Sequence, residues 1–382
     1  MPVSTGAVTE SAPTDTAPRA SSRQPERILV FHIGSLGDTL VSLPALTLIR
    51  KIWPGASITM LHPVTTAGVA SPDQILQASG LIDNFERSPV VRGAADRLTA
   101  SLRLWFQLVR KRYRTVIYLM RGDRPRVSVF RDWLFFTACL IPRRIGFFVF
   151  RPAELFVNQS GQSYHQADML IRRVRNDRHV REHAGPYRMS LPETAQKYAR
   201  QVLSALKHYP GRRPVAVCPG CKKPASSWPA ERFVEICRRL RQNGFDVIVL
   251  GGPADIPLGK QIQDEVDGIL DFCGKTSVLE SAALLTECAF TVGVDTGTTH
   301  LAAAAGTPCV TLFSAIAAPG RWNPMGEGHI ILRQSPPPPC AGCNRPICPV
   351  AGHPCMNSID VNMTWDAITR MIRHLGIGCP GE

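Results

Sequence analysis

From residue 27 onward, short apolar runs alternate with segments in which apolar residues recur every three or four positions. The first pattern is typical of buried strands, and the second of helices that cover a sheet. The strand-like runs are RILVFHIG, SITMLH and TVIYLM in the first half, and VAVCPG, DVIVLGG, AFTVGV and PCVTLF in the second. Strands that alternate with helices predict parallel sheets joined by right-handed crossovers. We therefore expect an α/β protein with two Rossmann-like, doubly wound parallel-sheet domains that face each other across a cleft.

Breaks in this pattern divide the chain. Residues 1–26 are rich in Ser, Thr, Ala and Pro and have no apolar period, which predicts a disordered tail and no secretory signal. We expect a first domain over residues 27–192 and a connector over 193–213 that begins with the helix ETAQKYARQVLSAL. A second domain then takes residues 214–382, including a Cys-rich loop and a terminal helix.

The charge balance limits the partners. The chain of 382 residues carries a formal net charge of +14, with Arg concentrated in RLWFQLVRKRYR and IRRVRNDRHVR. Nucleic acid, an anionic membrane face or an anionic substrate would each explain such a charge. No zinc finger, RNP aromatic motif or basic helix with heptads is visible, so we expect no nucleic-acid partner.

No apolar run is long enough to predict a membrane-spanning helix. The strongest candidate is WLFFTACLI, which is too short to span a bilayer. It predicts a buried helix, with contact to a membrane as the alternative.

The chain contains 12 Cys residues, and without a secretory signal we expect reduced thiols. Four of them lie in apolar segments and are predicted to act as small core residues: Cys139, Cys237, Cys288 and Cys309.

The stretch PPPPCAGCNRPICPVAGHPC holds a denser group, Cys340, Cys343, Cys348 and Cys355. The spacing of the first pair suits a zinc knuckle, and His353 is nearby, but the spacing of the second pair fits poorly. Ordinary loop packing of unreactive thiols is the alternative to a structural zinc ion.

The segment VGVDTGTTHLAAAAGTP predicts a strand that ends at Asp295 and a helix that opens with small residues. Backbone N–H groups and hydroxyls from Thr296, Gly297, Thr298 and Thr299 would suit a diphosphate at a helix N-terminus. Asp295 would repel phosphate, so we expect it to accept hydrogen bonds from sugar hydroxyls, and His300 could donate to an anion. The alternative is a purely structural role, in which Asp295 or Thr296 caps the helix and His300 packs in the core.

Two further strand ends carry candidate ligands. Lys222 and Lys223 follow VCPG and could neutralise phosphate charge, although an ordinary solvated loop would look the same. Asp255 follows VLGG and could bind the two hydroxyls of a ribose.

The segment FHIGSLGDTL reads as a strand, a Gly-rich turn and a helix, a pattern that commonly binds phosphate. We expect this helix to run as one element through DTLVSLPALTLIRKIWP, from Asp38 to Pro54. Here the turn (Gly34, Ser35, Gly37) carries a carboxylate, Asp38, where a phosphate would lie. The two glycines would let a ligand approach closely. Asp38 is either a functional carboxylate or a helix N-cap.

Together, five ordered blocks resemble glycosyltransferase family 9, the ADP-heptose:lipopolysaccharide heptosyltransferases and their relatives. The resemblance runs from Arg27 to about Ile368. The blocks are ILVFHIGSLGDTLVSLPAL, PRRIGF, VAVCPG with the later WPAERF, VIVLGGPAD, and VGVDTGTTHLAAAAGTPCVTLF.

The resemblance implies the GT-B architecture, two Rossmann-like domains with a cleft between them. It implies an inverting transferase that binds a nucleotide-diphosphate sugar, in the first place ADP-heptose, in the C-terminal domain and needs no metal or other cofactor. The acceptor would be an anionic glycolipid, the lipopolysaccharide core or a related glycan. Asp38 would be the general base on the acceptor side.

The family commonly has a basic residue just before the WP of the second block, where this chain has Ser226 and Ser227. Lys222 and Lys223 could take its place. A non-catalytic sugar-nucleotide or glycolipid binding protein on the same fold is the alternative function. In either case we expect a cytoplasmic protein, with peripheral contact to the inner face of the cytoplasmic membrane.

Overall fold

The computed structural model describes residues 25–64, 68–89, 93–149, 163–175, 187–204, 206 and 213–377. The predicted disordered tail lies outside the described residues, apart from its last two positions. No helix in this part of the chain is long and apolar enough to cross a membrane.

The first sheet has five parallel strands in the order β3-β2-β1-β4-β5. The strands are β1 (Arg27–Phe31), β2 (Ser57–Pro63), β3 (Asn84–Ser88), β4 (Thr115–Tyr118) and β5 (Arg143–Ile145). The strand order reverses between β1 and β4, and this reversal point is where doubly wound sheets bind ligands.

The second sheet has six parallel strands in the order β11-β10-β9-β6-β7-β8. Its strands are β6 (Val215–Cys218), β7 (Val247–Val249), β8 (Ile269–Asp271), β9 (Thr291–Val294), β10 (Cys309–Leu312) and β11 (Ile330–Leu332). Its reversal point lies between β6 and β9. The two doubly wound parallel sheets confirm the expected fold class.

Alternate residues of the central strand β1 face opposite sides of the first sheet, as the two-residue period of a strand requires. Ile28 and Val30 pack with one set of helices, and Leu29 packs with α4 and α5. The helices of this lobe are α1 (Leu36–Val41), α2 (Leu43–Ile52), α3 (Pro72–Leu76), α4 (Ala94–Lys111), α5 (Arg126–Ala138) and α6 (Gln166–Arg175).

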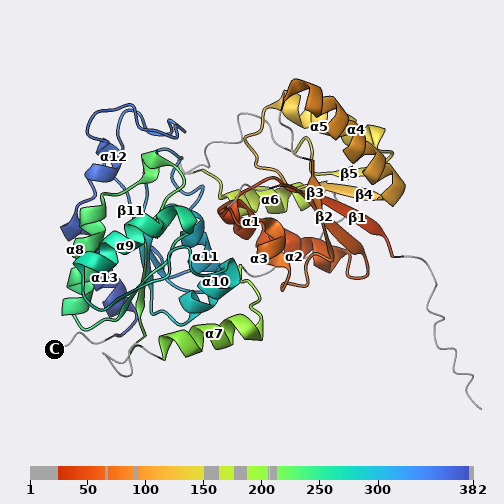
Figure 1. Ribbon diagram of the computed structural model, residues 1–382. Coiled ribbons are helices and arrows are strands. Elements are labelled where there is room, and N and C mark those ends of the chain that lie inside the picture. Colours follow the sequence, from red (N-terminus) through yellow and green to blue (C-terminus); the bar gives the residue numbers. More distant parts are fainter. Residues whose placement is uncertain are drawn as a thin grey trace, which may run out of the picture.

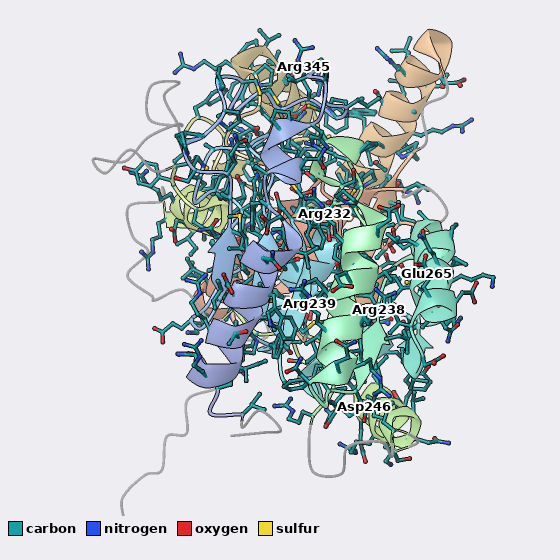
Figure 2. The ribbon with its side chains drawn as sticks, turned by 90° about the vertical axis from the view of Figure 1, so that its left-hand side faces the viewer. Arg232, Arg238, Arg239, Asp246, Glu265 and Arg345 are labelled. Carbon is teal, nitrogen blue, oxygen red and sulfur yellow. The ribbon has the colours of Figure 1, made fainter. Side chains whose placement is uncertain are left out.

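The connector and the second lobe contain the remaining helices of the described residues. They are α7 (Glu193–Leu203), α8 (Ala230–Gln242), α9 (Ile256–Glu265), α10 (Val278–Thr286), α11 (Gly297–Ala305), α12 (Pro354–Asn357) and α13 (Val361–His374), with short 3-10 turns η2 (Pro224–Ser226) and η3 (Pro253–Asp255). Figure 2 views the molecule from this lobe, where Arg232, Arg238 and Arg239 project from α8.

Two helix predictions need correction. The segment expected as one helix from Asp38 to Pro54 is split at Ser42, because Pro44 cannot continue the hydrogen bonding of α1 and instead lies in the first turn of α2. The stretch WLFFTACLI belongs mostly to α5, but this helix is not buried. Phe130 is 51% exposed and Leu134 is 46% exposed, so one side of α5 lies on the surface.

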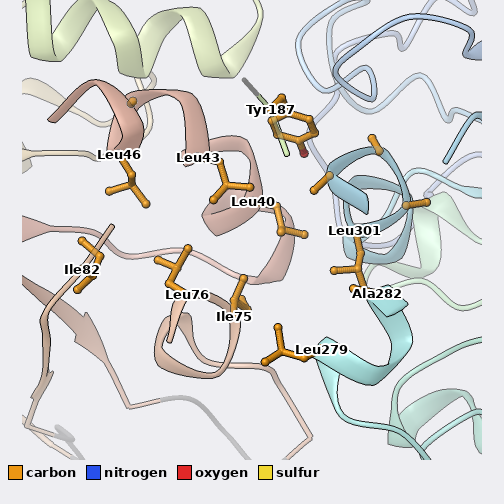
Figure 3. Packing of buried hydrophobic residues seen from close by; sticks show 14 of the residues in the cluster. Leu40, Leu43, Leu46, Ile75, Leu76, Ile82, Tyr187, Leu279, Ala282 and Leu301 are labelled. Atoms are coloured by element: carbon orange, nitrogen blue, oxygen red, sulfur yellow. The ribbon is translucent and has the colours of Figure 1, made fainter. Parts of the chain in front are cut away.

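An apolar cluster joins the two lobes. Leu40 of α1 and Ile75 of α3 lie opposite Leu301 of α11 and Leu279 of α10, and all four are buried (Figure 3). Helix α1 packs on α11, and both helices lie where the two lobes meet (Figure 1). The connector helix α7 packs against α10 of the second lobe. The cluster holds the two strand-reversal points close to each other.

The four Cys residues predicted to lie in apolar cores, Cys139, Cys237, Cys288 and Cys309, are buried as free thiols. Burial raises the pKa of the Cys139 and Cys237 thiols to about 12. These thiols therefore stay protonated, which fits a packing role.

Candidate functional site

A cleft of about 1080 Å³ lies between the lobes. Its walls include the loops that follow β1 and β4 in the first sheet and β6 and β9 in the second. These loops leave the carboxyl ends of the strands on either side of each reversal point. The cleft is therefore the place where a two-sheet protein of this kind binds its ligands.

Asp38 lines the cleft at the start of α1. The N-cap residue is Ser35, so the alternative that Asp38 itself is the N-cap is wrong. The backbone N–H and the hydroxyl of Ser35 both donate to Asp38 Oδ2, at 2.8 Å each. Within the described residues Oδ1 accepts no hydrogen bond, which leaves one carboxylate oxygen available to a ligand.

Gly34, just before α1, and Gly37, in its first turn, make room for side chains of the protein itself. A Cβ at Gly34 would overlap the Asp38 side chain, so Gly34 makes room for that carboxylate. A Cβ at Gly37 would lie 2.8 Å from Cδ2 of His300 across the lobe junction. Gly37 therefore lets α1 approach α11, and Leu36 packs closely on Gly297 in the same contact.

The start of α11 forms the opposite wall of the cleft. Thr296, Gly297 and Thr298 line it, and the hydroxyls of the two threonines are 2.8 Å apart. Thr296 is the N-cap, but no side chain caps the helix, so its first N–H groups remain open to an anion. Thr299 is different, because it is buried and its hydroxyl donates to the carbonyl of Val294. It does not line the cleft.

Asp295 also lines the cleft and is half-buried. Burial raises the pKa of this carboxyl to about 7, although Arg333 and Lys223 oppose the shift. A carboxyl with this pKa both accepts and donates hydrogen bonds near neutral pH, which suits sugar hydroxyls.

His300 is buried and lines the same wall. Burial lowers the pKa of His300 to about 4, His165 lowers it further, and Asp38 opposes both. The imidazole is therefore uncharged at neutral pH, so it can donate an N–H to an anion but cannot offset a full negative charge. Its Nδ1 has no hydrogen-bond partner among the described residues.

Both predicted lysines line the cleft. Lys222 is exposed, whereas Lys223 is half-buried and close enough to Asp295 to stabilise the charged carboxylate. Ser226, which stands where a basic residue was expected, is buried and shares a 3.0 Å hydrogen bond with Ser314. The lysines are thus better placed than Ser226 to meet a diphosphate.

Asp255 lines the cleft from η3. Its Oδ2 accepts from the backbone N–H of Gly252 at 2.8 Å, and its carboxylate fills the space that a Cβ at Gly220 would need. Burial raises the pKa of this carboxyl.

The structure adds cleft residues that the sequence reasoning missed. Arg121 and Asp123 follow β4, and Arg321 reaches Asp123 from the second lobe at 3.2 Å. Arg121 and Asp123 could have been found, because they follow a strand at a reversal point. Arg321 lies in a long loop after β10, and no local pattern marks it.

The Cys-rich loop forms a separate cavity of about 370 Å³, lined by Cys340, Cys343, Cys348, Cys355 and His353. His353 is engaged with the carbonyl of Ala225 at 3.0 Å. In the described part of the chain, no three His, Cys, Asp or Glu side chains are close enough to hold a metal ion together. The cysteines as placed do not fit a zinc site.

Solved structures share this fold. A family 9 glycosyltransferase from Veillonella parvula has a TM-score of 0.70 and 18% identity, over 91% of this chain and 98% of that one. The Escherichia coli ADP-heptose lps heptosyltransferase II has a TM-score of 0.65 and 17% identity, over 91% and 99%. The iron-containing glycosyltransferase TibC of enterotoxigenic E. coli has a TM-score of 0.50 and 16% identity, over 92% and 77%. These likenesses establish the GT-B fold.

Sequence relatives point in the same direction. Lipooligosaccharide heptosyltransferase 2 of Haemophilus influenzae is 30% identical over 148 residues, which is 37% of this chain and 41% of the relative. The chain thus matches about two fifths of the length of this curated relative. The model of glycosyltransferase family 9 (heptosyltransferase) matches residues 134–349, more than half of the chain. The chain belongs to glycosyltransferase family 9.

Proposed function

We propose that the protein is an inverting glycosyltransferase that moves a heptose from ADP-heptose to the lipopolysaccharide core or a related glycan. The observation that carries this proposal is the pairing in one cleft of Asp38, which has a free carboxylate oxygen, with the uncapped start of α11. The carboxylate of Asp38 could accept the proton of an incoming hydroxyl, and the start of α11 could bind a departing diphosphate. The names of the relatives supply the sugar and the acceptor class.

The donor lies on the C-terminal side of the cleft in this proposal. The diphosphate rests on the N–H groups at Gly297 and Thr298, with Lys222 and Lys223 beside it. Asp255 accepts hydrogen bonds from the ribose hydroxyls, and Asp295 accepts one from a hydroxyl of the transferred sugar. His300 contributes a neutral donor rather than a charge, because its pKa is about 4.

The reaction is a single displacement. Asp38 accepts the proton of the acceptor hydroxyl while that oxygen forms a bond to the anomeric carbon. The bond from the anomeric carbon to the diphosphate oxygen breaks on the opposite face, so the anomeric centre inverts. Negative charge grows on the departing ADP, and the α11 N–H groups and the lysines stabilise it.

We propose that this transfer needs no metal ion. Two lysines and a helix N-terminus already provide positive charge at the diphosphate position. Turnover should therefore survive saturating EDTA, followed as ADP release. Loss of turnover in EDTA that returns with a divalent ion would contradict this part of the proposal.

The location that goes with this function is the cytoplasm, at the inner face of the cytoplasmic membrane, where a glycolipid acceptor would be anchored. The excess of positive charge favours peripheral contact with an anionic membrane.

The test is ADP release from ADP-heptose in the presence of lipopolysaccharide-core acceptor, compared between the wild type and Asp38→Asn. Turnover by the wild type and its loss in the variant, with ADP binding retained in both, is the expected result. Tight ADP-heptose binding without turnover in either protein would favour the alternative of a non-catalytic binding protein.

A further inference from the structure

Eight of the exposed large apolar side chains lie between Leu98 and Leu140, on or next to two helices of the first lobe. They are Leu98, Leu102, Trp105 and Phe106 of α4, Val127, Phe130 and Leu134 of α5, and Leu140 just after it. We call this set the α4–α5 face. Scattered exposed apolar residues are common, but a contiguous set marks an interaction surface.

The spacing of these residues shows that each helix has two apolar sides. In α4, Leu104 and Leu108 pack toward the sheet, while Leu98, Leu102 and Trp105 recur every three or four positions on the outside. In α5 the same holds, because Val129 and Phe136 are buried beneath the outward residues. A helix that needed only to cover the sheet would carry polar residues on its outer side.

The two helices are neighbours on one side of the first sheet. Leu108 of α4 and Phe136 of α5 belong to the same buried cluster as Leu29, and Trp105 Nε1 of α4 donates to the carbonyl of Ala138, at the end of α5, at 2.8 Å. Phe130 stacks on Trp133, with ring centroids 6.0 Å apart, which extends the surface along α5.

The charge around this surface is predominantly positive. Between Ala94 and Phe148 the chain has twelve Arg or Lys residues and three Asp residues. One of the acids, Asp132, is buried and is hydrogen-bonded to Tyr118 and Arg131. In the part of the chain that the structure describes, Arg103 and Arg126 have no acidic partner. By contrast, Arg238 and Arg239, which Figure 2 labels on α8, each form an ion pair with Glu235, at 2.8 and 2.9 Å.

We infer that the α4–α5 face is a docking surface for an anionic lipid bilayer. Apolar side chains enter the interface between headgroups and acyl chains, and the surrounding Arg residues meet acidic headgroups. Aromatic residues such as Trp105 and Phe106 are common at this depth of a bilayer. This inference names the surface that would make the membrane contact in the proposed function. The docking surface itself is argued from the structure, and only its biological purpose rests on the proposed function.

Other occupants fit the surface less well. In a symmetric dimer through this face the same patch would meet itself, which brings like charges together. Nucleic acid would meet the basic residues but would leave the aliphatic side chains of Leu102 and Val127 without an apolar partner. An anionic bilayer would offer acidic headgroups to the basic residues and apolar acyl chains to the aliphatic residues.

The position of the surface suits a glycolipid acceptor. Arg121 and Asp123 line the acceptor side of the cleft, and α5 begins only a few residues later at Arg126. Val127, which is 80% exposed, is thus close along the chain to the cleft wall. A bilayer on the α4–α5 face would hold an anchored acceptor beside the first lobe, on the same side of the cleft as Asp38.

The test is flotation of the full chain with vesicles of phosphatidylglycerol and phosphatidylcholine, compared with pure phosphatidylcholine vesicles. The wild type should bind the anionic vesicles, and the bound fraction should fall as salt rises. Leu102→Glu/Phe130→Glu should weaken the affinity at least tenfold, because these side chains are about half exposed and carry the apolar contact. The matched control, Ile347→Glu/Met363→Glu, adds the same charge at exposed positions of the other lobe and should stay within about twofold of the wild type.

A second pair isolates the charges. Arg103→Gln/Arg126→Gln should weaken binding roughly ten- to thirtyfold, whereas Arg238→Gln/Arg239→Gln on α8 should change it little. Equal binding by the wild type and both α4–α5 variants would overturn the proposal. So would an oligomer in sedimentation that the Leu102→Glu/Phe130→Glu variant dissociates, because the face would then be a contact between copies.

Thermal shift with ADP separates this proposal from the proposed function. All variants should still be stabilised by ADP, because none of the substitutions lines the cleft. If no form of the protein bound ADP but vesicle binding depended on the α4–α5 face, the transferase proposal would fail and the docking surface would stand.

Discussion

The starts of α1 and α11 are built alike and have different chemistry. Each helix follows a strand at the reversal point of its sheet, and each has an extended N-cap, Ser35 or Thr296. The third helical residue differs. In α1 it is Asp38, which binds back to the N–H of Ser35, and in α11 it is Thr299, which binds the preceding strand.

The difference decides which ligand each helix start can accept. A carboxylate at the start of α1 already engages an N–H group that a phosphate would need, and it would repel the phosphate charge. The start of α11 has no side-chain cap and offers its N–H groups to an anion. One backbone arrangement thus provides a proton acceptor in one lobe and an anion site in the other.

The largest effect should come from removing the charge at the start of α1. Asp38→Asn keeps an oxygen that can accept from Ser35 N–H, so the fold and ADP binding should survive. Turnover should fall by roughly 10²- to 10⁴-fold, the usual contribution of a positioned base. ADP release and the melting temperature, measured on the same samples, check both expectations.

The control is Asp38→Ala, which also removes the hydrogen bonds to Ser35 and should cost about 1 kcal/mol of stability. An Asn variant with normal turnover would show that Asp38 serves only the start of the helix.

The next effect should come from making the start of α11 resemble that of α1. Thr298 lines the cleft and is half-buried, so Thr298→Asp would place a carboxylate in the anion site. Like charges a few ångströms apart at a protein surface repel by about 4 kcal/mol, and we expect ADP affinity to fall roughly 10²- to 10³-fold. Calorimetric titration with ADP measures the change.

Thr298→Asn is the matched neutral control and should bind ADP within about tenfold of the wild type. Equal affinities of the Asp and Asn variants would show that the diphosphate lies elsewhere in the cleft.

The replacement of both lysines should have a smaller effect. Lys222→Ala/Lys223→Ala removes charged hydrogen bonds worth about 1–3 kcal/mol, so donor affinity should fall about 5- to 150-fold. Lys223 should contribute more than Lys222, because it is half-buried and its charge acts on Asp295 in the same cleft. Lys260→Ala is the control, since Lys260 is exposed on α9 and pairs with Asp264. If the double variant bound the donor normally, Arg321 or Arg333 would be the better candidate.

The alternation of strands and helices could be predicted, because the apolar periodicity that indicates each element is a local property of the sequence. It identified β1, β2, β4 and β6 and placed Asp38 and Asp295 at strand ends. It failed where tertiary context decides. The apolar composition of WLFFTACLI predicted a buried helix, but one side of α5 is exposed. Composition alone does not say whether another element covers a helix.

The site was predictable only in part for a similar reason. Four neighbouring residues at the start of α11 looked equivalent, yet the Thr299 hydroxyl turns toward the strand, and no pattern indicates such a turn. Gly34 and Gly37 were expected to let a ligand approach closely, and that stays a prediction. What approaches them is Asp38 and His300, and the second lies on the other lobe.

The smallest effect should be a pH dependence of stability that reports the raised pKa of Asp295. Burial raises the pKa of Asp295 to about 7, so between its unfolded pKa near 4 and about pH 7 the folded state binds more protons than the unfolded state. The contribution of this group to stability is therefore full at low pH and is lost as the pH rises through 7. Asp295→Asn removes the titration, so the free energy of unfolding of the wild type minus that of the variant should decrease from pH 5 to pH 8. By linkage, a shift from about 4 to about 7 corresponds to a decrease of about 2–3 kcal/mol over this range, and screening by water at the partly exposed carboxyl should bring it down to about 1 kcal/mol. Urea unfolding of both proteins across this range measures the difference, and the contributions of groups such as His300 cancel in it. A difference that rises with pH would mean that Arg333 and Lys223 outweigh burial and lower the pKa of Asp295 instead of letting it rise.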